Sequence, residues 1–319
     1  MQQFAMLFPG QGAQFVGMGR NLAEAYPVAA QVFAQADDIL GFALSRLCFH
    51  GPEQELNDTI NAQPAIFVTS IAAWQVFRRL VGSELHPHAI AGHSLGEYSA
   101  LVAAGALDFA DALRLVRIRG QTMQQAGTIA PGGMLAVIGL DLPQIEQLAA
   151  MVAEQTGQIL TVANDNCPGQ VVVAGEPVAL EVFAQACMQQ EAAPPTRLKV
   201  SVAPHTPLMQ PALPAFQAAL AATPIADPGI PLVGNVSATW LRTATEVRHE
   251  LGTQLTHRVR WHESMQCLIA DGVDTMVEVA PGKVLSNIIR FIKRSIRRIN
   301  IGDDLATLTQ LDTLPANKQ

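Results

Sequence analysis

Residues 89–104, AIAGHSLGEYSALVAA, join a short apolar run to a run with helical spacing through the turn Gly92-His93-Ser94-Leu95-Gly96. This turn fits the pattern G-x-S-x-G, in which a sharp strand-to-helix turn lifts a serine into a cleft. Side chains at the two glycines would collide with the tightly turned backbone, and the serine itself adopts a strained conformation. The flanking runs supply the context that the motif requires, so Ser94 is the candidate nucleophile.

The segments around this turn predict an α/β protein. Phe4–Phe8 is a short apolar run, typical of a buried strand, and it leads into the permissive loop Pro9-Gly10-Gln11-Gly12. Residues 65–80 repeat apolar side chains at helical spacing, and a second helix is expected from Phe109 past Arg119. Further elements are predicted as a helix over 98–104 and strands over 89–91, 231–236 and 275–279.

Between about Met134 and Val202 the pattern changes. The predicted elements there are strands over 134–139, 159–163, 170–174 and 197–202, and helices over 142–154 and 177–190. The resulting order, β-α-β-β-α-β, is typical of a ferredoxin-like module. We therefore predict a large α/β-hydrolase-like domain, residues 1–128 and 203–319, into which a small ferredoxin-like subdomain, residues 129–202, is inserted.

Composition excludes several classes of protein. The 319 residues include 49% hydrophobic and 15% charged residues, without an apolar run of the roughly 18 residues that a membrane span needs. The N-terminal sequence has no export pattern, so we expect a cytoplasmic enzyme without a membrane partner. A net charge of −7 disfavours nucleic acid as a partner. The four cysteines are widely spaced, which argues against a zinc site and against a disulfide framework. We expect neither a metal nor a cofactor.

A serine nucleophile needs a base, and a histidine is the usual one. His93 adjoins the serine, but alternate side chains on a tight turn point apart, so we expect His93 to pack under the turn. His205 lies where the predicted insert ends and the large domain resumes, and clefts form at such junctions. The other histidines have no comparable context and are interpreted as surface or capping residues: His50, His86, His88, His249, His257 and His262.

A set of motifs runs in order over nearly the entire chain. They are Gly10-Gln11-Gly12, Gln63-Pro64-Ala65, Gly92-His93-Ser94-Leu95-Gly96-Glu97, Arg119-Gly120, residues 164–174 (NDNCPGQVVVA), His205, residues 254–261 (QLTHRVRW) and residues 278–285 (EVAPGKVL). Together they resemble the malonyl-CoA:acyl carrier protein transacylases, including free-standing acyltransferases of polyketide synthases. The resemblance implies malonyl-CoA and an acyl carrier protein as partners, in fatty acid or polyketide biosynthesis.

The resemblance also implies roles for single residues. Ser94 and His205 would form a dyad in which the main-chain carbonyl of Gln254 orients the histidine, and the N–H groups of Gln11 and Leu95 would form the oxyanion hole. Such preset donors are commonly worth about 3 to 4 kcal/mol each. Arg119 would bind the malonyl carboxylate, because a guanidinium can do so bidentately. Gln63, Asn164 and Asn166 resemble further pocket positions.

The sequence departs from the family at Ala203-Pro204-His205. Relatives commonly carry serine or phenylalanine directly before the histidine, often with a proline two residues before it. Pro204 fixes its own φ and removes an N–H beside the base. The choice between malonyl, methylmalonyl and other extender groups therefore stays open, with Leu95 favouring malonyl by resemblance.

Three other functions are compatible with these motifs. A serine acyl hydrolase would admit water to the acyl-serine, whereas Arg119 and the resemblance favour transfer. A malonyl-loading subunit of another acyl carrier system, such as malonate decarboxylase, would share the same residues. A non-catalytic scaffold leaves unexplained why a nucleophile, a base and a carboxylate-binding arginine are all present.

A basic cluster near the C-terminus departs from the acidic average. Cations recur at helical spacing within residues 288–298 (IIRFIKRSIRR), and the isoleucines fall on another face. The pattern predicts an amphipathic helix, although the last two arginines also suit a following strand. Because acyl carrier proteins are typically acidic, we predict that Lys293 and Arg294 help to dock the carrier protein.

Overall fold

The computed structural model of the protein describes residues 3–82, 85–190, 193–200, 202–302 and 304–314. In this part of the chain, the strands β10 (Arg297–Ile301), β9 (Val273–Val279), β1 (Gln3–Phe8), β2 (Ala89–Gly92), β7 (Leu232–Val233) and β8 (Trp240–Leu241) form one sheet in that order. Neighbouring strands of this large sheet are parallel, except that β8 runs antiparallel to β7. Parallel strands require crossover connections, which the helices supply.

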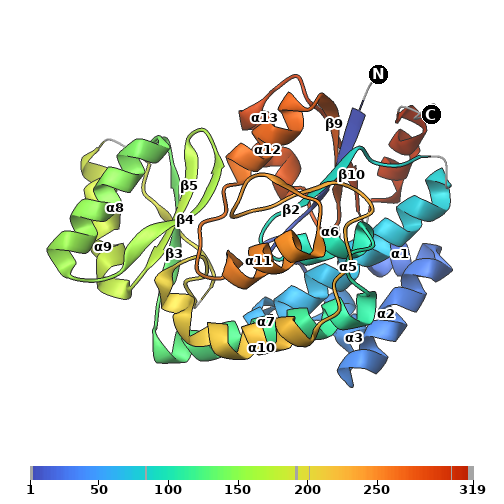
Figure 1. The fold of residues 1–319 in the computed structure, drawn as a ribbon, viewed down its shortest axis with the longest axis horizontal. Helices are drawn as coiled ribbons and strands as arrows, with labels where there is room; N and C mark the ends of the chain where they lie inside the picture. The colour runs from blue at the N-terminus through green and yellow to red at the C-terminus, as the bar shows by residue number, and fades with distance from the viewer. Residues whose placement is uncertain (1–2, 83–84, 191–192, 201, 303, 315–319) are drawn as a thin grey trace.

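Helices pack around the large sheet and on one side of the small sheet (Figure 1). They are α1 (Arg20–Ala25), α2 (Pro27–Leu40), α3 (Leu44–His50), α4 (Glu53–Asn57), α5 (Thr59–Val81), α6 (Gly96–Ala103), α7 (Phe109–Ile129), α8 (Leu142–Thr156), α9 (Pro177–Gln189), α10 (Leu213–Ala222), α11 (Ala244–Gln254), α12 (Trp261–Ala270) and α13 (Val284–Ile292), with the 3-10 helices η1 (Pro207–Ala212) and η2 (Leu305–Thr313). None of the helices in the described ranges combines the length and the apolar character that crossing a bilayer requires.

Strand β1 shows why the large sheet is buried on both faces. Alternate side chains of a strand point to opposite faces. Phe4 and Phe8 pack edge-on against Phe77 and Trp74 of α5, with ring centroids 6.4 and 6.3 Å apart. Leu7 faces the other side and belongs to a second apolar cluster that α12 and α13 complete. The long helix α5 therefore covers one face of the sheet, and α12 and α13 cover the other.

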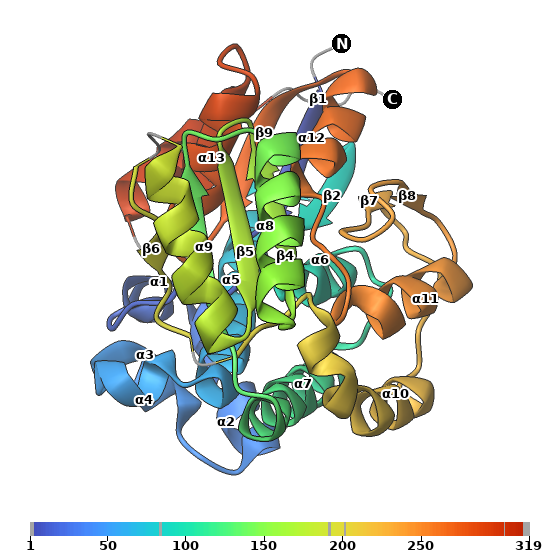
Figure 2. The same ribbon diagram turned by 90° about the vertical axis from the view of Figure 1, so that its left-hand side faces the viewer.

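The small sheet contains β4 (Leu160–Cys167), β5 (Gln170–Gly175), β3 (Gly133–Ile138) and β6 (Thr196–Arg197), in that order, and all its pairs are antiparallel. Along the chain its elements follow the order β3, α8, β4, β5, α9, β6. Helices α8 and α9 lie together in front of this sheet in Figure 2, and they share one apolar cluster with it. The opposite face contributes Met134, Val172 and Ala174 to the main core, so the two sheets are packed as one body.

Most predicted elements are confirmed, with bounds that differ by a few residues. The last predicted strand, over 197–202, is confirmed as β6 only at its start: beyond Arg197 one bond joins the Leu198 N–H to the Met134 carbonyl, and the Val200 N–H then bonds to the carbonyl of Leu198, which turns the chain. Ser201, within that prediction, lies outside the described residues. The predicted helix over 288–298 is also wrong beyond Ile292: Lys293 is extended, and the last two arginines begin strand β10.

Candidate active site

The turn Gly92–Gly96, which we call the elbow, connects β2 to α6 and presents Ser94 with φ 51°. A Cβ on Gly92 would lie 2.1 Å from the carbonyl of Gly96, and a Cβ on Gly96 would lie 2.0 Å from the carbonyl oxygen of Phe8. Both contacts are far inside van der Waals distance, so glycine is required on either side of the serine. Ser94 itself occupies the left-handed region, a strained conformation of the kind that clusters at active sites.

His205 is hydrogen-bonded to Ser94, with 2.8 Å between Nε2 and Oγ. Its Nδ1 lies 2.8 Å from the carbonyl oxygen of Gln254 and 3.2 Å from that of His257. Because carbonyl oxygens only accept hydrogen bonds, Nδ1 carries the proton and Nε2 is left as an acceptor for the serine hydroxyl. The main chain of His205, with φ 64°, is fixed by its N–H, which donates to the carbonyl of Leu255 at 2.7 Å.

The electrostatic surroundings keep His205 neutral. Burial, together with the positive charge of Arg119, lowers the pKa of His205 to about 3. The carbonyl of Gln254 acts in the opposite direction, because it accepts the Nδ1 proton, but burial outweighs it. At neutral pH the imidazole is therefore in the form that can take a proton from Ser94.

Arg119 extends from α7 and ends beside the nucleophile. Its side chain is buried, and its Nη2 donates to Ser94 Oγ at 3.1 Å and to Gln254 Oε1 at 2.9 Å. Its Nη1 donates to Gln63 Oε1 at 2.7 Å, whereas Nε has no hydrogen-bond partner among the described residues. The guanidinium also lies over the Tyr98 ring, 5.6 Å from its centroid. Burial lowers the pKa of Arg119, because a desolvated cation without a carboxylate bonded to it is costly.

The loop that carries Gln11 contacts the elbow that carries Leu95, since a Cβ on Gly10 would lie 2.4 Å from the carbonyl oxygen of His93. Gln11 lies in the loop after β1, and Leu95 caps the start of α6. Within the described ranges, neither N–H donates to a protein acceptor. The side chain of Gln11 is anchored by Thr59, to whose Oγ1 its Nε2 donates at 3.1 Å. Unpaired N–H groups beside a nucleophile are available to an anionic ligand or intermediate.

Ser94, His205 and Arg119 line a cavity of about 460 Å³ between the large and the small sheet. The loop after β1, the elbow, α7, the small sheet and α13 form its wall. Other residues that line it include Gln11, Met123, Met134, Asn164, Asn166, Val172, Pro204 and Leu285. Its mixed apolar and polar wall is typical of a small-molecule site.

His93 lines the cavity but makes no hydrogen bond to Ser94 Oγ. Its Nε2 lies 2.9 Å from Asn166 Oδ1, and its ring packs edge-on against Trp261 at 5.2 Å. Burial lowers the pKa of His93, so this imidazole is neutral as well. His93 thus links the elbow to strand β4 of the small sheet, which carries Asn164 and Asn166.

Lys293 and Arg294 lie outside the cavity. Both side chains are exposed, and they follow the last turn of α13, whose first turns supply Leu285 and Ile288 to the cavity wall. Among the described residues, no cluster of three or more histidine, cysteine, aspartate or glutamate side chains could hold a metal ion.

Sequence reasoning missed two buried polar residues that hold the elbow. The Asn235 side chain accepts from the Ser94 N–H, and the Glu97 carboxylate accepts from Asn235 and from Gln254 Nε2, the latter at 2.5 Å. Burial, with Glu250 nearby, raises the pKa of Glu97 well above its usual range. The only sequence signal for Asn235 was its place at the end of a strand-like run.

A serine on a strand-to-helix turn, a neutral histidine bonded to it and a guanidinium in the same cavity define a nucleophilic acyl-transfer site in an α/β fold. The family model described as acyl transferase domain matches residues 5–307. The chain belongs to this acyl transferase family, in the branch that contains the malonyl CoA-acyl carrier protein transacylases.

Individual relatives support this assignment over nearly the full chain. The malonyl CoA-acyl carrier protein transacylase of Bacillus subtilis (strain 168) is 41% identical, with 98% of each chain covered, and that of Haemophilus influenzae is 42% identical, covering 95% of this chain and 96% of the relative. Among solved structures, a type II PKS acyl-carrier protein in complex with its malonyl-transacylase matches with TM-score 0.94, 41% identity and coverage of 98% and 100%. An acyl carrier protein S-malonyltransferase from Vibrio cholerae matches with TM-score 0.91, 40% identity and coverage of 97% and 100%.

Proposed function

We propose that this acyltransferase moves a malonyl group from coenzyme A to the phosphopantetheine thiol of an acyl carrier protein, through an acyl-Ser94 intermediate. The observation that carries the proposal is the guanidinium of Arg119, whose Nη2 lies 3.1 Å from Ser94 Oγ in the cavity that both residues line. A buried guanidinium without a carboxylate partner at that distance suits an acyl group that ends in a free carboxylate. An acetyl group has no such end.

The two half-reactions use the same residues. Ser94 Oγ attacks the thioester carbonyl while its proton passes to His205 Nε2, and the N–H groups of Gln11 and Leu95 stabilise the oxyanion. The C–S bond then breaks, and the coenzyme A sulfur takes the proton from His205. In the second half-reaction the phosphopantetheine thiol gives its proton to His205 and attacks the acyl-serine, and Ser94 recovers the proton as its C–O bond breaks.

The other residues that the resemblance singled out have supporting roles in this proposal. Gln63 and Gln254 hold Arg119 through their side-chain oxygens, and the Gln254 carbonyl orients His205. Asn164 and Asn166 line the acyl pocket, and Asn166 also holds His93.

We interpret the fold as a hydrolase-like domain, residues 1–128 and 203–319, with a ferredoxin-like insert, residues 129–202. The chain order β-α-β-β-α-β and the sheet order β4-β5-β3-β6 support the second part of this interpretation. The cytoplasmic location stays a prediction.

The direct test of the function is a two-step incubation. The pure protein is mixed with malonyl-CoA, desalted and weighed by mass spectrometry, and we expect one malonyl group per chain. Added acyl carrier protein in its phosphopantetheinylated form should then remove that group and become malonylated. If the group is released to water as fast without the carrier protein, the chain is instead a serine acyl hydrolase.

The low pKa of His205 predicts that the rate of Ser94 acylation changes little as pH falls below neutrality. A histidine whose pKa is lowered stays neutral as pH falls, so the base form persists until the pH approaches about 3. We expect the rate constant for Ser94 acylation at pH 5.5 to stay within about twofold of its value at pH 7.5, whereas an imidazole of ordinary pKa, about 6.5, would lose roughly tenfold per pH unit below it. Stopped-flow detection of coenzyme A release measures this rate.

The same pKa also affects folding. The unfolded chain takes up a proton on this histidine below about pH 6.5 and the folded chain does not, so the contribution of His205 to stability is lost progressively as pH falls below that value. The melting temperature is therefore measured at each pH to keep the comparison within the folded protein. An acylation rate that declines with a midpoint near 6.5 in folded protein would contradict the neutral, buried base.

We also propose that Lys293 and Arg294 help to dock the carrier protein. The helix that was predicted to include them, α13, ends at Ile292, directly before Lys293. Both are exposed at the end of the helix that borders the cavity, and complementary charge mainly speeds encounter. Changing both to glutamate should raise the KM for the carrier protein several-fold and flatten its salt dependence, with self-acylation by malonyl-CoA unchanged. An unaltered KM at low salt would move the docking surface elsewhere.

A further inference from the structure

Both polar atoms of the Asn235 side-chain amide bond to the elbow. It directly follows Gly234 at the end of β7 and is fully buried. Its Oδ1 accepts the N–H of Ser94 at 2.6 Å, and its Nδ2 donates to the carbonyl of Gly92 at 2.6 Å and to Glu97 Oε1 at 3.1 Å. The amide thus bonds to the chain on both sides of His93.

The carbonyl of Ser94 is held as well, because Gln254 Nε2 donates to it at 3.0 Å. A peptide group is planar and trans, so a fixed carbonyl directs the N–H of the next residue to the opposite side. The bond from Gln254 therefore sets the direction of the Leu95 N–H, and the bond to Asn235 sets the peptide before Ser94. Together the two amides hold the strained serine, at φ 51°, and the neighbouring oxyanion donor in one orientation.

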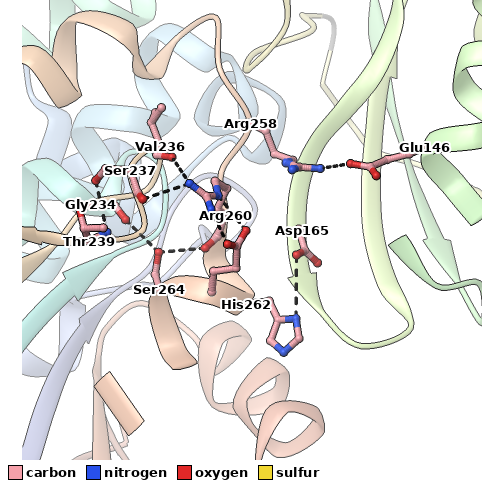
Figure 3. Close-up of polar contacts among 11 residues, drawn as sticks. Glu146, Asp165, Gly234, Val236, Ser237, Thr239, Arg258, Arg260, His262 and Ser264 are labelled. Carbon is pink, nitrogen blue, oxygen red and sulfur yellow. Dashed lines mark hydrogen bonds and ion pairs between the residues drawn. The ribbon is translucent and has the colours of Figure 1, made fainter. Parts of the chain in front are cut away.

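The loop that carries Asn235 is itself anchored from the large domain (Figure 3). The Asn235 N–H donates to Glu97 Oε1 at 3.0 Å, and its carbonyl accepts the Arg260 N–H at 2.8 Å. The Arg260 side chain donates to the carbonyls of Val236 and Ser237, and Ser264 Oγ donates to that of Gly234 at 2.9 Å.

The segment that supplies Arg260 also reaches the small sheet. The Val259 carbonyl accepts the Asp165 N–H at 2.9 Å, and Figure 3 shows Arg258 directed at Glu146 of α8 and His262 at Asp165. Leu255, three residues before Arg258 on the same stretch of chain, fixes His205 through its carbonyl, which accepts the His205 N–H. One stretch of chain, residues 255–260, therefore bonds to both Asn235 and His205 and fixes their positions relative to each other.

We propose that Asn235 is a positioning residue for acyl transfer, which keeps Ser94 and the Leu95 N–H in the geometry that the tetrahedral intermediate requires. The proposal rests on the acyl-Ser94 chemistry proposed above. Only a side chain that accepts and donates at adjacent atoms can bond to both the Ser94 N–H and the Gly92 carbonyl. An ionised aspartate lacks the donor, but a protonated aspartic acid has the same shape and restores it.

This equivalence gives a test that a purely structural role does not pass. In Asn235→Asp, the carboxyl lies beside the Glu97 carboxylate, with Glu250 and Arg260 bonded to the adjacent residues of the loop. The neutral acid should be active and the ionised form inactive. We expect the acylation rate of this variant to fall as pH rises through the pKa of the new carboxyl. The wild-type rate should not fall as pH rises toward neutrality.

Asn235→Ala tests the loss of the whole amide, and Ser264→Ala is its control. In Asn235→Ala we expect the rate constant for acylation to fall about 10- to 100-fold at an unchanged dissociation constant for malonyl-CoA, because a misplaced nucleophile loses rate rather than affinity. Ser264→Ala removes a bond to the same loop without touching the elbow, so it should lower the melting temperature and leave the rate within twofold.

A folded Asn235→Ala with a rate within twofold of wild type would overturn the proposal, and so would an Asn235→Asp whose rate has the same pH profile as wild type. If Asn235→Ala does not fold, the pH profile of Asn235→Asp decides alone. Labelling of Ser94 by a fluorophosphonate, measured in parallel, separates this proposal from the function: it reports the position of the nucleophile even if malonyl-CoA proves not to be the donor.

Discussion

Ser94→Ala should abolish the covalent adduct with malonyl-CoA and reduce malonyl transfer by about 10⁴-fold or more, as losses of catalytic nucleophiles do. The variant retains the cavity, the neutral imidazole of His205 and the guanidinium of Arg119, but it has no oxygen to take the acyl group. Malonyl-CoA binding by calorimetry should persist. Mass spectrometry of the protein after mixing with malonyl-CoA checks the adduct.

Ser99→Ala is the matched control for this variant. Ser99 lies on α6, one turn beyond the elbow, and its buried Oγ has no hydrogen-bond partner among the described residues. Its removal should leave acylation unchanged. An adduct of the same mass on Ser94→Ala would show that another side chain is the nucleophile, and peptide mapping would then identify it.

The sequence predicted the elbow because the motif and the elements on either side of it are adjacent along the chain. A Cβ on Gly92 would collide with the backbone of Gly96 within the same turn, and a Cβ on Gly96 would collide with the carbonyl of Phe8 in β1. The strand before the turn and the helix after it also follow from local apolar spacing. The fold prediction therefore succeeded where the local pattern and the tertiary contacts favour the same structure.

It failed where tertiary contacts override local pattern. The isoleucines and cations of residues 288–298 have helical spacing, yet Ile296 is buried in the cluster beside α12 and α13, and the residues after it pair with β9. Likewise, Leu198, Lys199, Val200 and Val202 belong to a stretch of strand-like composition but line the cavity. Neither outcome is visible without the partners across the fold.

The site was predicted in part for the same reason. Ser94 and His205 carry signals in their neighbours along the chain, and resemblance supplied Arg119, Gln254 and Gln11. Asn235 and Glu97 act only through bonds that join segments 138 residues apart, and an asparagine after a strand is common in loops. Their part in holding the elbow appears only in three dimensions.

Arg119→Ala should separate malonyl from acetyl substrates. The variant leaves the malonyl carboxylate unpaired in a buried pocket, and the lost charged hydrogen bonds cost about 1.5 to 3 kcal/mol, which corresponds to a fall of about 10- to 150-fold in kcat/KM. Acetyl transfer should be unchanged or faster, because acetyl-CoA gains nothing from the guanidinium and the Oγ of Ser94 is freed from one donor. Competition between the two acyl-CoAs, read as the ratio of adduct masses, measures the switch directly.

Arg114→Ala on the same helix is the control, since Arg114 is exposed and bonds to Asp111 at its own helix start. It should change neither malonyl nor acetyl transfer.

Arg119→Lys tests geometry as well as charge. A lysine restores a cation but not the planar fork that binds Gln63 and Gln254 together, so it should recover only part of the malonyl rate. Removing the Arg119 charge also removes one cause of the low pKa of His205, so the acid limb of Arg119→Ala should shift toward higher pH. Equal losses for malonyl and acetyl groups would instead assign Arg119 to holding the elbow and Gln254, with the carboxylate recognised elsewhere in the cavity.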